Sequence, residues 1–161
     1  MTIKKNRRII EILKCVGYII LCLLIGIVGA LFTKTGPDSW YSQLHKPIFN
    51  PPNWIFGPVW TLLYIMMGIA IYLAVKNKVS TNSIKIFAIQ LSVNLLWTIL
   101  FFGLENIFLA AIEIIILLGF ILWTIKVFYK KSVTAAYLLI PYALWVTFAT
   151  CLTWAIFILN H

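Results

Sequence analysis

Five long apolar blocks, separated by shorter polar connections, make up most of the sequence. The blocks run over residues 9–32, 54–75, 84–103, 107–128 and 133–159, approximately. Each has about the 20 residues that a helix needs to cross the hydrocarbon core of a bilayer. The blocks lack the alternation of apolar and polar residues that is typical of barrel strands. The pattern therefore predicts an all-α membrane protein, with five transmembrane helices in a single domain over residues 1–161.

Composition and charge agree with this prediction and orient it. Hydrophobic residues make up 63% of the chain and charged residues 11%, which excludes an ordinary soluble domain. In a five-span topology most cations fall on one side of the membrane: Lys4, Lys5, Arg7, Arg8, Lys14, Lys76, Lys78, Lys85, Lys126, Lys130 and Lys131. The positive-inside rule then predicts a cytoplasmic N-terminus, with the C-terminus outside. The net charge of +9 therefore indicates topology and a lipid partner, and no nucleic-acid partner is expected.

The connection after the first block, about residues 33–53, is unusually long and rich in proline and aromatic residues. Proline stiffens a loop because it fixes φ and removes a backbone donor. Tryptophan and tyrosine add large flat surfaces that each carry one polar group. We therefore expect a structured loop on the outer side, which caps a cavity for a flat, apolar small molecule.

Aromatic and amide side chains recur at helical spacing on three of the predicted helices. These shared faces comprise Trp60 and Tyr64; Gln90, Asn94, Trp97 and Phe101; and Tyr142, Trp145 and Ala149. An amide inside a membrane span needs a hydrogen-bond partner from a neighbouring helix or from a ligand. The three faces predict a flat slot with a few polar atoms, although aromatic stripes at this spacing also form ordinary bundle cores.

Candidate chemistry beyond this slot is sparse. Glu113 is the one acid well inside an apolar block, where it would serve as a proton relay or ligand partner, or simply reach water. The chain has four acidic residues and lacks P-loop, G-x-S-x-G and H-E-x-x-H motifs. We therefore expect no metal site and no required cofactor.

Four motifs resemble one known family. They are Trp40-Tyr41-x-x-Leu44-x-Lys46-Pro47; Pro51-Pro52-x-Trp54-x-Phe56-x-Pro58-Val59-Trp60-x-x-Leu63-Tyr64; Gln90-Leu91-x-x-Asn94-x-x-Trp97-x-x-x-Phe101-Phe102; and Pro141-Tyr142-x-x-Trp145-x-x-Phe148-Ala149-x-x-Leu152. Together with the five-helix layout, they resemble the tryptophan-rich sensory protein/translocator protein (TspO/MBR) family, also called the peripheral-type benzodiazepine receptor family.

The resemblance implies an integral protein of a bacterial cell membrane, commonly a homodimer, whose cavity binds tetrapyrroles such as protoporphyrin IX and haem. Bacterial members of the family promote light-dependent degradation of protoporphyrin. Two cavity tryptophans important for this activity match Trp60 and Trp145, which are therefore the candidate catalytic residues. With the helix faces above, the expected ligand-binding set is Tyr41, Trp60, Tyr64, Gln90, Asn94, Trp97, Tyr142, Trp145, Phe148 and Ala149.

Porphyrin sensing and photo-oxidative degradation are the functions that this resemblance implies, and whether turnover is enzymatic stays open. The alternatives are a transporter of porphyrins or similar lipophilic compounds, and a non-catalytic membrane protein that regulates stress responses. Thr153 stands where many members carry asparagine, and no Lys or Arg follows Trp154 to complete a sterol motif. Sterol binding is therefore not expected.

Overall fold

The computed structural model describes residues 2–161, with side chains from Asn6 onward, so the predicted cytoplasmic side chains of Lys4 and Lys5 lie outside the described part. The helices are α1 (Thr2–Phe32), α2 (Trp40–Gln43), α3 (Asn53–Lys76), α4 (Thr81–Thr98), η1 (Ile99–Gly103), α5 (Ile107–Tyr129), α6 (Val133–Leu138) and α7 (Ile140–Leu159). Five stretches are long and apolar enough to span a membrane: Asn6–Phe32, Asn53–Lys76, Thr81–Gly103, Ile107–Tyr129 and Val133–Leu159. The predicted all-α bundle of five apolar spans is confirmed.

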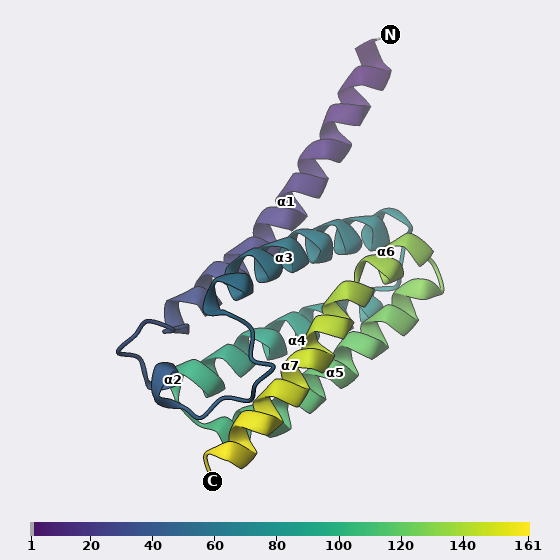
Figure 1. The fold of residues 1–161 in the computed structure, drawn as a ribbon. Coiled ribbons are helices and arrows are strands. Elements are labelled where there is room, and N and C mark those ends of the chain that lie inside the picture. Colours follow the sequence, from purple (N-terminus) through teal and green to yellow (C-terminus); the bar gives the residue numbers. More distant parts are fainter. Residues whose placement is uncertain (1) are drawn as a thin grey trace.

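The spans pack as neighbours around a common core (Figure 1). α1 lies along α3, α4 lies along α5, and α5 also packs against α6 and α7. Small and aliphatic side chains, including Met67, Ala70, Ala74 and Leu117, are buried where the helices meet. In lipid, such close packing rather than water expulsion drives helix association.

α1 and α3 approach each other closely at Gly68. A β-carbon built there would overlap the Ile19 backbone of α1, so glycine is what allows α3 to come this near. Toward the loop of residues 33–52, called the capping loop after its expected role, the same two helices are separated by side chains, and Gly26 of α1 faces the ring of Tyr64. The glycines therefore set the spacing of α1 and α3 at the inner end of the cavity described below.

The fifth span is two helices instead of one. α6 ends at Leu138 and α7 begins at Ile140, with Pro141 in the first turn of α7. The sequence predicted a single helix that Pro141 bends, but the chain breaks just before the proline. The reason is physical: proline has no N–H and its ring crowds the preceding turn, so it is best accommodated at a helix start.

A widened turn ends the third span. The Leu104 N–H donates to the Ile99 carbonyl at 2.8 Å, five residues back, and the Asn106 N–H donates to the Leu100 carbonyl at 3.0 Å. The segment Ile99–Gly103 is therefore a π-helix, a form that is frequent at functional sites. The sequence predicted an uninterrupted helix to residue 103, because hydrophobicity alone carries no signal for a π-turn.

Candidate ligand-binding cavity

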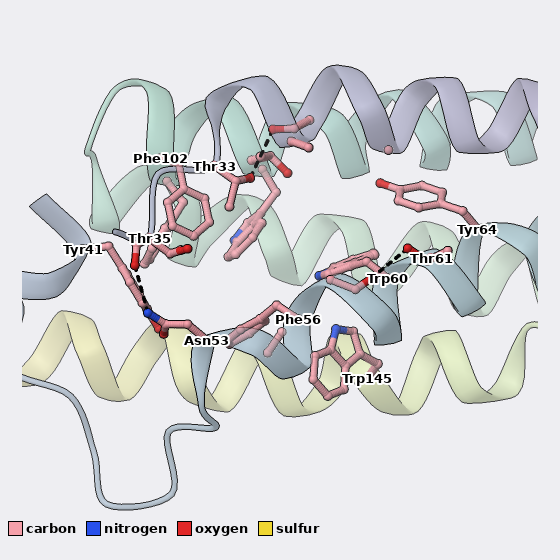
Figure 2. A pocket seen from close by; sticks show the side chains of 18 of the residues that line it. Thr33, Thr35, Tyr41, Asn53, Phe56, Trp60, Thr61, Tyr64, Phe102 and Trp145 are labelled. Atoms are coloured by element: carbon pink, nitrogen blue, oxygen red, sulfur yellow. Dashed lines mark hydrogen bonds between the residues drawn. The ribbon is translucent and has the colours of Figure 1, made fainter. Parts of the chain in front are cut away.

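A cavity of about 490 Å³ opens between α1, α3, the third span, α7 and the capping loop. Figure 2 shows its labelled side chains, with Tyr41 and Phe102 at the end nearest the loop and Tyr64 at the other end. The residues that line it are Leu23, Gly26, Ile27, Gly29, Ala30, Thr33, Thr35, Tyr41, Asn53, Trp54, Phe56, Gly57, Trp60, Thr61, Tyr64, Trp97, Thr98, Phe101, Phe102, Trp145, Ala149, Leu152, Thr153 and Ile156. Its volume lies in the range of about 300–1,000 Å³ that small-molecule sites occupy.

Contacting aromatic rings form much of the wall. Trp60 lies 5.7 Å from Tyr64 between ring centroids, and Phe56 lies 6.0 Å from Trp145 at an interplanar angle of 70°. Pairs at such separations stabilise one another beyond the effect of burial alone. The rings support each other in fixed orientations, so the cavity presents flat faces to a ligand.

Trp97 adds a polar group to this wall. Its ring stacks on Phe101, with centroids 5.2 Å apart and an interplanar angle of 18°. Its indole N–H is buried and has no hydrogen-bond partner among the described residues. Buried donors normally find an acceptor, so this N–H is an unsatisfied polar group beside the cavity.

The inner end of the cavity is closed by a buried hydrogen bond. The Tyr64 hydroxyl donates to Asn94 Oδ1 at 2.6 Å, and both residues are buried. Gln90 lies on the same face of α4 one turn earlier, with its amide nitrogen 4.0 Å from the Met67 sulfur. These polar groups hold α3 and α4 together behind the cavity wall.

The structure brings most of the predicted ligand-binding residues to one place. Tyr41, Trp60, Tyr64, Trp97, Trp145 and Ala149 line the cavity. Four others lie outside its lining: Gln90, Asn94, Tyr142 and Phe148. Asn94 supports Tyr64 as described, and Tyr142 supports Trp60 with ring centroids 6.2 Å apart. In this conformation these four residues lie one layer back from the space, and ligand contact by them stays a prediction.

Several lining residues were absent from the sequence-based set. The first span contributes Gly26 and Ala30, the loop after it contributes Thr33, and the π-turn contributes Phe102 beside Phe101. Adjacent residues on a helix point about 100° apart, and the helical spacing placed only Phe101 on the expected face. The structure shows that Phe102 lines the cavity as well. Gly26 and Ala30 do form a small-residue pair in the sequence, but such a pair is equally compatible with simple helix contact.

Glu113 is buried in α5, with 6% of its surface exposed. Its two carboxylate oxygens have no hydrogen-bond partner among the residues that the structure describes. In this conformation the Glu113 side chain therefore does not reach water, which was one of the expected alternatives. Glu113 is not part of the cavity lining.

The capping loop is held in place by side-chain hydrogen bonds. The Tyr41 hydroxyl donates to Asn50 Oδ1 at 3.0 Å, and the Asn53 amide donates to the Thr35 carbonyl at 3.0 Å. Burial raises the pKa of the Tyr41 phenol, partly offset by the bond to Asn50, so this hydroxyl remains a donor at neutral pH. The Lys46 ammonium lies 4.5 Å from the centroid of the Tyr41 ring, which places a positive charge near this end of the cavity.

Asn160 fastens the loop to the end of α7. Its side chain accepts from the His45 N–H at 3.0 Å and donates to the His45 carbonyl at 2.9 Å.

We expect Asn160→Ala to speed hydrogen exchange at the His45 amide about tenfold, because each lost bond is worth about 1 kcal/mol. Exchange mass spectrometry on the detergent-solubilised protein measures this. Asn77→Ala, which removes a bond to Ser132 in another connection, is the control, and equal exchange in both variants would contradict the prediction.

On one side the cavity reaches the outer surface of the bundle. Ile27 of α1 and Trp54, Gly57 and Thr61 of α3 all line it and are exposed. These residues lie on helices that span the membrane by length and composition. The cavity therefore communicates with the surroundings between α1 and α3, as well as facing the loop.

Comparison with known proteins identifies the family. The TspO/MBR family model matches residues 18–159. The chain belongs to the TspO/MBR family. It is 45% identical to the tryptophan-rich protein TspO of Archaeoglobus fulgidus over 152 residues, which cover 93% of this chain and 99% of that protein. It is 42% identical to the tryptophan-rich protein TspO of Chlorobaculum tepidum over 161 residues, covering 96% and 99% of the two chains.

The family likeness extends to animals. The translocator protein of Homo sapiens is 33% identical over 139 residues, which cover 83% of this chain and 82% of that protein. The resemblance inferred from the sequence motifs is thus confirmed. The chain is an integral membrane protein of the TspO type, and the cavity is its candidate functional site.

Proposed function

We propose that the protein binds a tetrapyrrole, protoporphyrin IX or haem, in the aromatic cavity. The observation that carries the proposal is the wall of mutually supported rings around a space of about 490 Å³. A porphyrin is flat and aromatic, so it gains stacking and apolar contact from such a wall. The unsatisfied Trp97 N–H beside the wall would supply a donor once a bound ligand opens access to it, and Lys46 would supply positive charge for a porphyrin carboxylate near the loop.

The bound porphyrin would be sensed or degraded in light. An excited porphyrin generates reactive oxygen species, and indole rings at contact distance can quench it, donate an electron or react. Trp60 and Trp145 both line the cavity, which supports a role for them in this chemistry. The proposal includes a homodimer, a cytoplasmic N-terminus, and an outer face that carries the capping loop and the C-terminus.

Transport of porphyrins is the competing function. The cavity opens between α1 and α3 and reaches the loop, while the buried Tyr64–Asn94 bond and the close contact of Gly68 with α1 close its inner end. Among the described residues, these contacts lie between the cavity and the opposite end of the bundle. This geometry favours binding and sensing over passage through the bundle.

Titration with protoporphyrin IX in the dark tests the proposal. We expect saturable quenching of tryptophan fluorescence in the detergent-solubilised protein, and a lower affinity in the Tyr41→Phe and Trp60→Phe variants. Trp123→Phe is the matched control, because Trp123 lies exposed on α5 outside the cavity. Non-saturable quenching, or equal affinity losses in the control, would overturn the assignment.

We expect haem and metal-free protoporphyrin IX to bind with dissociation constants of the same order of magnitude. The described lining residues include no histidine, cysteine or methionine, and the Tyr41 and Tyr64 hydroxyls already donate to asparagine side chains. The usual axial ligands of haem iron are therefore missing from the wall, and the macrocycle itself would supply the affinity. Parallel titrations measure this, and a haem spectrum typical of axial ligation with much tighter binding would contradict it.

A further inference from the structure

A second concave site lies on the outside of the bundle, between α3 and α7. Figure 1 shows that these helices come together near α6 and separate toward the capping loop. α3 packs its backbone closely against α1 and α6, whereas α7 packs against α5. Side chains therefore bridge α3 and α7, chiefly the ring contacts of Phe56 with Trp145 at 6.0 Å and of Trp60 with Tyr142 at 6.2 Å.

These bridging rings leave a groove of about 360 Å³ on their outer side. Val59, Leu62 and Leu63 of α3 form one wall, and Leu144, Trp145 and Phe148 of α7 form the other. The two sets follow helical spacing, so each is one face of its helix. The walls are formed by hydrocarbon and ring surfaces, in contrast with the cavity, where the hydroxyls of tyrosine and threonine and the Trp97 N–H are present.

The surroundings of the groove indicate what occupies it. Leu62 is 59% exposed and Leu144 is 66% exposed, and both belong to helices that span the membrane by length and composition. The rim of the groove is thus continuous with the lipid-facing surface of the protein. The molecules at that surface are lipids, whose acyl chains are hydrocarbon. The groove has too few polar groups to orient a polar ligand, but its apolar walls can contact an acyl chain along its length.

Trp145 belongs to both sites, because it lines the cavity and the outer groove. Its ring lies between Phe56 of α3 and Phe148 of its own helix, at centroid distances of 6.0 and 5.6 Å. The Trp145 side chain therefore separates the internal cavity from the outer groove and contacts both.

We propose that the α3–α7 groove binds one acyl chain of a bilayer lipid, and that Trp145 separates this chain from the internal cavity. The acyl chain would pack against the outer side of the Trp145 ring. The backbones of α3 and α7 are not closely packed there and do not support the ring themselves. This site is distinct from the cavity proposed for tetrapyrroles, and its occupation does not depend on what the cavity binds.

Photo-crosslinking in nanodiscs tests the proposal. The full-length protein is reconstituted with phosphatidylcholine that carries a diazirine within one acyl chain, irradiated, and digested for mass spectrometry. We expect adducts on Leu62 and Leu144 to exceed, several-fold, those on Leu24 and Leu122. These two leucines are exposed to 52% and 55%, lie on other lipid-facing surfaces, and match the residue type. Equal labelling of all four leucines would show ordinary surrounding lipid and overturn the proposal.

Two substitutions sharpen the result. Filling the groove with Leu144→Trp is expected to reduce the adducts on Leu62 several-fold, while Leu122→Trp leaves them unchanged. Trp145→Ala removes the partition, so adducts are expected to spread to Leu152, a buried residue of the cavity wall, whereas Trp145→Phe keeps them out. Absence of both effects would overturn the proposal. Fewer adducts on Leu62 and Leu144 than on the two control leucines would also overturn it, because another copy of the chain then covers the groove. Circular dichroism confirms that each variant is folded.

Discussion

Replacing Gly68 with alanine is expected to lower the free energy of unfolding by about 3 kcal/mol, near the upper end of typical overpacking costs. The added β-carbon would lie 2.8 Å from the Ile19 backbone nitrogen and closer still to its Cα. A helix backbone does not yield as a flexible side chain does, so α1 and α3 must separate. Denaturation of the detergent-solubilised protein with sodium dodecyl sulfate, followed by tryptophan fluorescence, measures the change.

Two other glycines serve as controls for this experiment. A β-carbon at Gly119 of α5 meets nothing within 4 Å, so Gly119→Ala is expected to be neutral or stabilising by up to about 1 kcal/mol, since alanine favours a helix. At Gly26 the added atom meets the Tyr64 ring, which is a side chain but is buried and hydrogen-bonded. We expect an intermediate loss there. If Gly68→Ala were as stable as Gly119→Ala, the close contact of α1 with α3 would be wrong.

The double substitution Trp60→Phe/Trp145→Phe is expected to reduce light-dependent loss of bound protoporphyrin to the rate in protein-free micelles. Phenylalanine keeps a ring at each position but is a much poorer electron donor than indole. Because a ring remains at each position, much of the stacking contact is kept, so dark binding is expected to weaken several-fold but stay measurable. The decay of the porphyrin Soret band under constant illumination, at saturating protein, measures the effect.

The control for the photochemistry keeps the number of tryptophans equal. Trp123→Phe/Trp154→Phe removes two indoles that are absent from the cavity lining, and its decay rate is expected to match the unmodified protein. Equal decay in the two double variants would remove the photochemical role from Trp60 and Trp145. It would leave dark binding, and therefore the sensing function, as a separate question that the titration answers.

The two predictions address different parts of the same design. Gly68 and the Tyr64–Asn94 bond close the inner end of the bundle, and that closure determines where the cavity ends. Trp60 and Trp145 face the space so formed, supported from behind by Tyr142 and Phe148. The packing of α1 on α3 therefore links the stability of the bundle to the shape of the candidate site.

The spans and much of the cavity wall were predictable from the sequence. Five apolar blocks require five helices in lipid, because the backbone must satisfy its own hydrogen bonds there. The motifs around Trp60, Trp97 and Trp145 then indicated which helix faces turn inward, and all three residues line the cavity. Periodicity assigns a side chain to a face of its own helix, and the family motifs selected the faces that matter.

The layer in which a side chain lies was not predictable in this way. Gln90, Asn94 and Tyr142 occupy inward faces as expected but lie behind the wall, because Tyr64 and Trp60 come between them and the space. Phe148, by contrast, lines the outer groove together with Trp145. Which residue of an inward face touches a ligand depends on how neighbouring helices diverge, and a single helix carries no record of its neighbours.

The sequence by itself determined that this chain is a five-span membrane protein with an aromatic, proline-stiffened loop, since hydrophobic length and local stereochemistry act within each segment. The structure added the break before Pro141, the π-turn beside Phe102, the contribution of α1, and the division of Trp145 between cavity and groove. Only the tertiary structure decided the last two, which depend on how helices approach one another, and the backbone contact at Gly68 sets how closely α1 and α3 approach at the inner end of the cavity. Packing between segments, which no local pattern encodes, shaped the site.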